Sequence, residues 1–301
     1  MTPVKQKIVA TSGILTTALV WGLMWYPFRS LNAQGVSVPM ASLATYLVTI
    51  AAGLTLFFKV YRRQFHFEPV LVLLTLLFGW CNFSYTMAVA EGHVMRVLLL
   101  FYLSPLWTAL WSRLLLHEHL TGRGWAVVGL SLLGCGVFIY RPELFAGELP
   151  LTHRYEWLAL SGGMAFALGN VISRRSHGIP VPVKSATVWF GVALIGAFSL
   201  LQSGDLPRML EIPAESWLVL SILGVVLLCT SVVSQYGLSI MPATQAMTLM
   251  LMELVFAAVS AYLLAGEKMS LQEWLGGALI AGASLLSGGM SRPGSKPQPT
   301  P

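Results

Sequence analysis

Apolar and polar residues follow one another along this chain in long blocks. Apolar runs of about 20 residues recur with short polar segments between them, and a helix of that length crosses a hydrocarbon core of ~30 Å. We expect ten such runs to be membrane-spanning helices. They cover residues 8–28, 38–58, 69–90, 94–116, 122–140, 157–174, 184–201, 217–238, 243–265 and 271–289. The pattern therefore predicts an all-α polytopic membrane protein.

Composition indicates the same class. The 301 residues are 56% hydrophobic and only 10% charged, with a mean hydropathy of +0.73. Soluble domains carry about 25% charged residues, so this chain lacks the polar surface that a water-soluble globule needs. The net charge of +6 is interpreted as Lys and Arg in cytoplasmic loops and not as a nucleic-acid site. We expect a lipid bilayer as the surroundings and no nucleic acid as a partner.

The polar segments divide the chain into parts. We expect a cytoplasmic N-terminus (1–7), a first five-helix repeat (8–140), an extracytoplasmic connector (141–156), a second five-helix repeat (157–289) and a disordered cytoplasmic tail (290–301) that contains four prolines. The first run is too long for a cleaved signal peptide and carries Trp21 and Trp25 without a small-residue cleavage site. It is therefore predicted to be a membrane span.

Lys and Arg in the loops predict the orientation. With the N-terminus inside, twelve of the Lys and Arg residues fall on the inner side and six on the outer side. Cytoplasmic loops carry the excess of positive charge. We therefore expect both termini in the cytoplasm, with the protein in a bacterial inner membrane.

The two halves of the chain resemble each other. At an offset of 149 residues, the pairs are Ala109 and Ala258, Leu114 and Leu263, Glu118 and Glu267, Thr121 and Ser270, and Trp125 and Trp274. Both copies consist of an apolar helix, a Glu, a short turn with a hydroxyl residue and a further helix. Five spans per half is an odd number, so the halves would be inverted around a central cavity, as in many secondary transporters.

With this pattern the chain resembles the drug/metabolite transporter superfamily, EamA type, and within it the YddG-type exporters of aromatic amino acids. The resemblance rests on Trp21-Gly22, Asn82, Tyr85, Arg96, Tyr102, Pro105 and the helix–Glu–turn–helix units at Glu118 and Glu267. It implies export of small organic solutes through a central cavity by alternating access, without ATP. One departure is that Glu253 and Leu254 stand where the repeat would place a second proline, so no proline kink is expected there.

Polar groups and deep aromatic rings inside the apolar runs are the candidate substrate-binding residues. Lipid cannot hydrogen-bond such polar groups, so they should face the interior of the bundle. The alternatives are hydrogen bonds between helices without substrate contact and, for tryptophan, a place in the interfacial belt. Tyr102 and Trp107 would point in different directions on a straight helix. The candidates are Trp21, Trp25, Asn82, Tyr85, Tyr102, Trp107, Phe166, Asn170, Gln235 and Gln245.

Glu253 and Arg96 are the candidates for coupling or gating. A charged acid in the middle of an apolar helix costs roughly 2.5–3.5 kcal/mol even on insertion scales, so Glu253 is expected to face water or carry protons. The alternative is a protonated or hydrogen-bonded glutamate that holds helices together. Arg96 would either attract a substrate carboxylate or snorkel to the interface. Glu118, Glu267 and Pro105 are interpreted as structural residues at helix ends.

These features predict a secondary transporter that exports small amphipathic metabolites, with aromatic and other neutral amino acids as the favoured substrates. The alternatives are a carrier for a cationic drug or a nucleotide-sugar, an intramembrane enzyme and a structural membrane subunit. We expect no enzymatic activity, cofactor or metal, and either a monomer or a homodimer. Cys81, Cys135 and Cys229 lie in apolar runs and are interpreted as packing residues.

Overall fold

The computed structural model describes residues 3–116, 119–140, 151–176, 178–240, 249–250, 252–286 and 291–292. Several predicted features lie outside these residues, namely Glu118, Gln245, most of the connector and most of the C-terminal tail. The side chain of Gln235 is also outside the description, although its backbone is helical.

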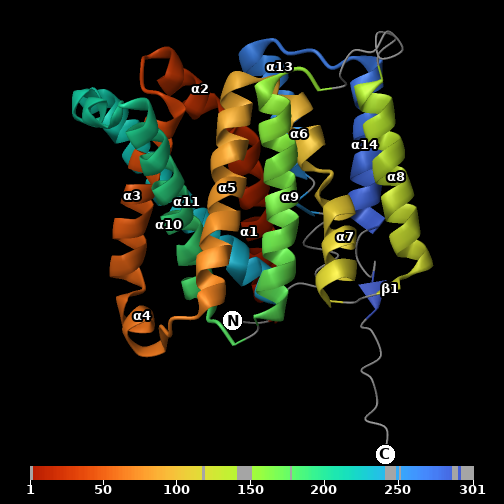
Figure 1. The fold of residues 1–301 in the computed structure, drawn as a ribbon, viewed down its shortest axis with the longest axis horizontal. Helices are drawn as coiled ribbons and strands as arrows, with labels where there is room; N and C mark the ends of the chain where they lie inside the picture. Colours follow the sequence, from red (N-terminus) through yellow and green to blue (C-terminus); the bar gives the residue numbers. More distant parts are fainter. Residues whose placement is uncertain are drawn as a thin grey trace, which may run out of the picture.

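Every predicted apolar run contains at least one helix (Figure 1). The helices are α1 Pro3–Leu23, α2 Trp25–Ala33, α3 Val38–Leu56, α4 Phe58–Gln64, α5 Pro69–Glu91, α6 Val94–Phe101, α7 Ser104–Leu116, α8 Gly122–Ile139, α9 Arg154–Arg175, α10 Val181–Ser203, α11 Ala214–Ile240, α13 Met252–Ala265 and α14 Leu271–Leu286, with a 3₁₀ helix η2 at Leu206–Glu211. Two-residue strands, β1 His119–Leu120 and β2 Ser291–Arg292, pair in the antiparallel sense. The described fold is otherwise helical.

Six helices in the described part of the chain are long and apolar enough to cross a membrane. They are Ile8–Ala33, Val38–Leu56, Pro69–Glu91, Val94–Leu115, Val181–Ser203 and Ala214–Ser234. Gly122–Val137 and Met252–Ala265 are shorter apolar helices. This arrangement is that of a multi-pass membrane protein, as the sequence predicted.

Two of the predicted spans are interrupted. The first divides at Met24 into α1 and α2, and the fourth divides at Tyr102 and Leu103 into α6 and α7. Pro105 is the second residue of α7, where its missing N–H costs nothing and its fixed φ suits the first helical turn. In the second half, α13 is described from Met252 onward, and Glu253 is the second residue of this range.

The two halves pack with matching partners. Helix α1 packs on α11 and α13, and α9, its counterpart in the second half, packs on α5, α6 and α7. Helices α3 and α11 pack together as α10 and α5 do, while α3 contacts α10 and α8 contacts α14 (Figure 1). Arg29 of α2 bonds to the Gly92 carbonyl and Arg154 of α9 contacts Glu91. The first span therefore ends where α9 begins, so these counterparts run in opposite directions.

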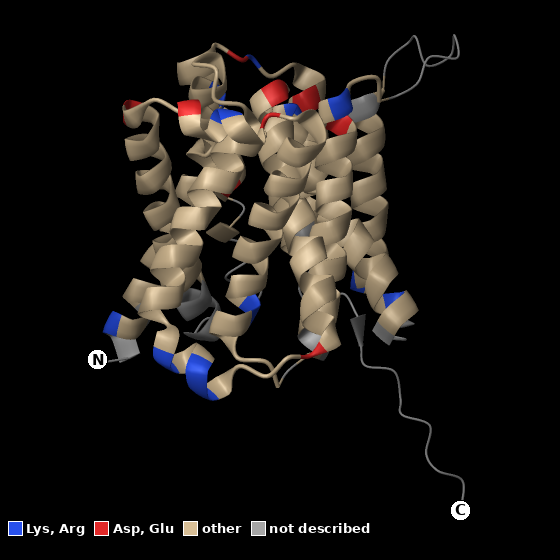
Figure 2. Cartoon of the chain, turned by 60° about the vertical axis from the view of Figure 1, so that its left-hand side comes forward, with Lys and Arg blue, Asp and Glu red and all other residues tan. Residues whose placement is uncertain are grey.

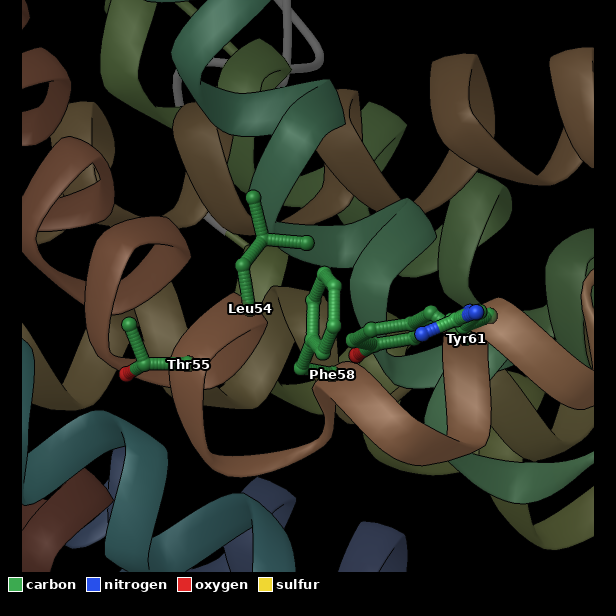
Figure 3. Close-up of a pocket in the computed structure, with 5 residues that line it drawn as sticks. Leu54, Thr55, Phe58 and Tyr61 are labelled. Carbon is green, nitrogen blue, oxygen red and sulfur yellow. The ribbon is translucent and has the colours of Figure 1, made fainter.

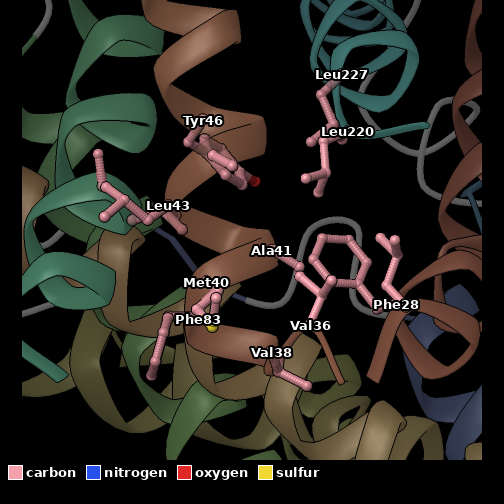
Figure 4. Packing of buried hydrophobic residues seen from close by; sticks show 14 of the residues in the cluster. Phe28, Val36, Val38, Met40, Ala41, Leu43, Tyr46, Phe83, Leu220 and Leu227 are labelled. Carbon is pink, nitrogen blue, oxygen red and sulfur yellow. The ribbon is translucent and has the colours of Figure 1, made fainter. Parts of the chain in front are cut away.

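The main hydrophobic core lies between α2, α3, α5, α10 and α11 (Figure 4). Phe28, Met40 and Tyr46 belong to it, and each is at most 5% exposed. A Cβ at Gly53 of α3 would lie 2.3 Å from the ring of Trp189 on α10, so a glycine is needed for this indole to pack against α3. A second cluster joins residues of α1, α2, α5, α6, α9, α13 and α14 and contains the rings of Trp21, Tyr85, Phe101 and Tyr102.

The two ends of the bundle differ in charge. Figure 2 shows mainly Lys and Arg at the end that carries the N-terminus. At the opposite end, acidic residues gather together with basic ones. We call the first the N-terminal end and the second the Arg29 end, because Arg29 lies there beside Gly92.

Candidate functional site

A glutamate held by two tyrosines lies where the halves meet. Glu253 is in the first turn of α13 and is partly buried. The hydroxyl of Tyr102, in the turn that ends α6, donates to Oε2 of Glu253 at 2.8 Å. The hydroxyl of Tyr85, on α5, donates to Oε1 at 3.3 Å. Hydrogen bonds to a charged acceptor are the strong ones, so these phenols offset part of the cost of an acid inside an apolar helix.

Aromatic rings continue from this carboxylate across the first half toward α9. The ring of Trp21 meets that of Tyr85 edge to face, with centroids 6.0 Å apart. Tyr85 contacts Phe101 at 5.2 Å, and Phe101 contacts Phe166 of α9 at 5.6 Å. Such arrangements are the favoured geometry of aromatic pairs. We name Trp21, Tyr85, Phe101, Tyr102 and Phe166 the aromatic cluster.

A close helix crossing fixes the position of Glu253. A Cβ at Gly22 would lie 2.8 Å from the Cβ of Phe256 and 3.0 Å from the backbone carbonyl oxygen of Glu253. Only a residue without a side chain lets α1 approach α13 so closely. The Trp21-Gly22 pair therefore places an indole on the aromatic cluster and brings the backbone of α13 beside it.

The predicted amides are less directly placed at the site. Asn82 donates to the carbonyl of Phe78 and Asn170 to that of Phe166, each within its own helix. Trp107 packs against the second hydrophobic cluster, and among the described residues its buried indole nitrogen has no hydrogen-bond partner. Because the chain turns between α6 and α7, the straight-helix argument that separated Tyr102 from Trp107 does not apply.

Trp25 lies in a network toward the Arg29 end. Its indole N–H donates to the hydroxyl of Ser260 at 2.9 Å, and the guanidinium of Arg29 lies 4.7 Å from its ring centroid. Arg29 also forms an ion pair with Glu267 at 2.9 Å and donates to the carbonyls of Val89 and Gly92. Trp25 is 2% exposed and its N–H is occupied, so the structure does not bring it into the aromatic cluster.

Glu267 does more than end a helix. Its second oxygen accepts from the backbone N–H of Val94 at 2.9 Å, at the first residue of α6. The carboxylate therefore caps a helix of the first half while it holds Arg29 of the same half. Through Glu267, the turn between α13 and α14 is fastened to the first half at the Arg29 end.

Arg96 is held by a fully buried acid. It forms an ion pair with Glu156, whose side chain is 0% exposed. The other oxygen of Glu156 accepts from the backbone N–H groups of Thr152 and His153 and caps the start of α9. The structure thus places Arg96 in a contact between α6 and α9 and not beside Glu253.

Besides Arg29, three residues of this region were not predicted. Phe101 links Tyr85 to Phe166, but no spacing distinguishes it from the other phenylalanines. Ser260 is one of many small residues in an apolar helix. Glu156 did carry a usable signal, since it lies three residues after His153 at a helix start, the spacing of a capping box.

Comparison with known proteins decides the family. The EamA-like transporter family matches two stretches of the chain, residues 8–140 and 153–289, which are nearly the two predicted repeats. The chain belongs to the EamA-like transporter family. Membership in this family makes it a transporter and not an enzyme.

Individual proteins agree with this assignment. An uncharacterized transporter of Pseudomonas aeruginosa is 26% identical over 181 residues, which are 58% of this chain and 57% of the relative. The chain thus matches somewhat more than half the length of that relative. A protein of known crystal structure is 20% identical with a TM-score of 0.61, covering 96% of this chain and 99% of its own. That likeness concerns the fold alone.

Proposed function

We propose that this EamA-like transporter exports small amphipathic metabolites, with aromatic and other neutral amino acids as its substrates. It would do so as a ten-span protein of the bacterial inner membrane, with two inverted five-helix halves and both termini in the cytoplasm. The opposite directions of α1 and α9 and the matching packing partners support the inverted halves. The excess of Lys and Arg at the N-terminal end supports the orientation.

The observation that carries the substrate proposal is the carboxylate of Glu253 beside an aromatic cluster. A neutral amino acid presents an ammonium group, a carboxylate and a side chain. Glu253 would pair with the ammonium, and the rings of Trp21 and Phe101 would contact an aromatic side chain. The buried indole N–H of Trp107, which has no acceptor in the described part of the chain, would donate to the substrate carboxylate.

Export would proceed by alternating access. The ion pair of Arg29 with Glu267 fastens α2 to the turn after α13, and both residues also bond to the backbone where α5 ends and α6 begins. These bonds would hold the Arg29 end closed in this state. Opening of that end would require Arg29 and Glu267 to separate, while the N-terminal end closes.

Glu253 would also carry the coupling proton. Its carboxylate lies within a described span and accepts hydrogen bonds from two phenols. A bound ammonium group and a proton would compete for this carboxylate. In the simplest form of antiport, a proton binds this carboxylate when the substrate ammonium leaves it. Coupling of this kind predicts that transport depends on a proton gradient.

Uptake into proteoliposomes tests the proposal. Labelled Phe, Trp, Thr and a cationic drug would be compared with and without a proton gradient, using the wild type and Glu253→Gln. We expect the amino acids to move, with the gradient stimulating the wild type and not the variant. Movement of the drug alone would overturn the substrate. Unchanged transport and unchanged pH dependence in Glu253→Gln would remove this residue from the mechanism.

A further inference from the structure

A groove lies at the N-terminal end, on helices α3 and α4, which carry no residue of the Glu253 site. It has a volume of about 800 Å³ and is lined by Leu54, Thr55, Phe58, Tyr61 and Arg62, at the junction of α3 and α4 (Figure 3). A smaller cavity of about 460 Å³ shares Phe58 and Arg62 and adds Lys59 and Arg63. The first cavity has an apolar wall and the second a basic one.

The short helix α4 is held in place although none of its residues is buried. The hydroxyl of Tyr61 donates to the carbonyl of Pro182 at 3.1 Å, just inside the start of α10. Partial burial raises the pKa of Tyr61 to about 12, so this donor stays protonated at neutral pH. Phe57 packs edge to face on the same ring at 6.4 Å. The groove is therefore preformed by contacts between α3, α4 and α10.

The charge of α4 is not balanced locally. Lys59, Arg62 and Arg63 lie within seven residues that contain no acid. In the part of the chain that the structure describes, none of the three forms an ion pair. Next to them, Leu56 and Phe58 expose 65% and 59% of their surface. A row of cations directly beyond a membrane span, beside exposed apolar side chains, matches the depth at which lipid phosphates lie.

We propose that this groove binds one anionic phospholipid. An acyl chain would lie along Leu54 and Phe58, and the phosphate would lie among Lys59, Arg62 and Arg63. A lipid fits better than a soluble anion because the basic cavity and the apolar groove share Phe58 and Arg62 and form one continuous surface. The groove also opens at the end of α3, where the exposed side chains of the span face the bilayer.

Native mass spectrometry of the delipidated full chain tests the site. Phosphatidylglycerol and phosphatidylcholine with the same acyl chains would be titrated in parallel. We expect one phosphatidylglycerol to be retained, at least about fivefold more tightly than phosphatidylcholine, since each Lys or Arg near an anionic headgroup adds attraction of that order. The triple variant Lys59→Gln, Arg62→Gln, Arg63→Gln should lose this preference. Equal retention of both lipids by the wild type would overturn the proposal.

A matched variant separates a built site from general attraction by charge. Lys5→Gln, Arg113→Gln, Arg123→Gln removes three cations from the same end of the bundle but none from the groove. It should keep the preference for phosphatidylglycerol. An equal loss in both triple variants would mean attraction by net charge only. Phe58→Ser keeps every charge and should weaken the retention of phosphatidylglycerol. Displacement of the lipid by glycerol phosphate at equal concentration would show that the acyl chain contributes nothing and would overturn the proposal.

Discussion

Two phenols share the carboxylate of Glu253, and their hydrogen bonds differ in length. Tyr102 donates at 2.8 Å and Tyr85 at 3.3 Å, so Tyr102 makes the stronger bond. Tyr102→Phe removes this bond while it keeps the ring. A hydrogen bond to a charged group contributes about 1.5–3 kcal/mol, so without it the carboxylate of Glu253 is less firmly held in place to pair with the substrate ammonium, and we expect the KM of the transported amino acid to rise about tenfold.

Tyr85→Phe is the matched comparison for this prediction. It removes the longer bond and keeps the edge-to-face contacts with Trp21 and Phe101. We expect a rise in KM of about threefold or less, because a bond near 3.3 Å is weak. Proteoliposome uptake over a range of substrate concentrations measures both values. A larger effect of Tyr85→Phe would contradict the ranking of the two tyrosines.

A second prediction concerns the buried hydroxyl of Ser260. It accepts from the indole of Trp25 and donates to the carbonyl of Gly22 at 3.0 Å. Ser260→Ala would leave the buried indole N–H unsatisfied, which costs about 1–3 kcal/mol. Thermal unfolding in detergent should show a clear fall in Tm. Ser30→Ala removes the exposed bond that its hydroxyl accepts from Gln34 at the end of α2, and it should leave Tm nearly unchanged, because water replaces the lost partner there.

At the scale of single residues, the sequence singled out Glu253 but did not predict which neighbouring side chains bond to it. Glu253 stands out because a charge in an apolar helix is costly, and Tyr85 and Tyr102 because lipid cannot satisfy phenols. The same rule cannot tell a phenol that reaches across helices from an amide such as Asn82, which bonds to its own helix. That choice depends on rotamers and on helix breaks, which residue type alone does not specify.

Among the elements, α1 and α13 approach each other closely at Gly22. A methyl group there would meet the Cβ of Phe256 at 2.8 Å and the N of Ala257 at 3.0 Å. Both are backbone or near-backbone atoms, so relief requires the helices to move apart. Gly22→Ala should therefore lower Tm and reduce transport by displacing Glu253. Overpacking of this kind costs typically about 1–3 kcal/mol.

Gly129→Ala is the control for this crossing. A Cβ at Gly129 on α8 would meet no atom within 4 Å, so the same substitution should be neutral or slightly stabilising in a helix. Thermal unfolding and proteoliposome uptake of both variants make the comparison. Equal effects of the two substitutions would mean that helix propensity, and not the crossing, determines the outcome.

The elements were more predictable than their interruptions. Apolar runs of membrane length place a helix in each span because the backbone in lipid must satisfy its own hydrogen bonds. The turn at Tyr102 and Leu103 has one visible signal, Pro105, which favours a helix start. The break at Met24 has a similar signal, Pro27 in the first turn of α2, whose missing N–H leaves the carbonyl of Leu23 at the end of α1 without its usual donor. The exact residue at which each span turns depends on packing, which a local pattern does not contain.

For the whole molecule, the decisive contacts are those that join the two halves at the Arg29 end. Arg29 and Glu267 bridge different halves, whereas Arg208 and Asp205 pair within one turn of chain. The sequence repeat marked Glu267 as one of a pair, but it gave no partner, because Arg29 lies 238 residues away. Long-range pairing of this kind is set by how the halves pack.

If the Arg29–Glu267 ion pair holds this end closed, its removal should shift the population toward the state that is open there. A partly exposed pair contributes up to about 1 kcal/mol, which is about a fivefold shift between two states. A single cysteine at Phe166, in a chain without Cys81, Cys135 and Cys229, would report access to the aromatic cluster. Arg29→Gln should raise its labelling by a membrane-impermeant maleimide from the Arg29 side.

Arg208→Gln separates this effect from a general loss of charge at the same end. Its partner Asp205 belongs to the same turn, so its removal unfastens no contact between the halves and should leave labelling unchanged. Glu267→Gln should raise labelling as Arg29→Gln does, and the double variant should add little, because both substitutions remove the same bond. Additive effects would mean that the two residues act separately, Glu267 through the N–H of Val94 and Arg29 through the carbonyls of Val89 and Gly92. The closure would then depend on these three backbone contacts and not on the ion pair that joins the halves.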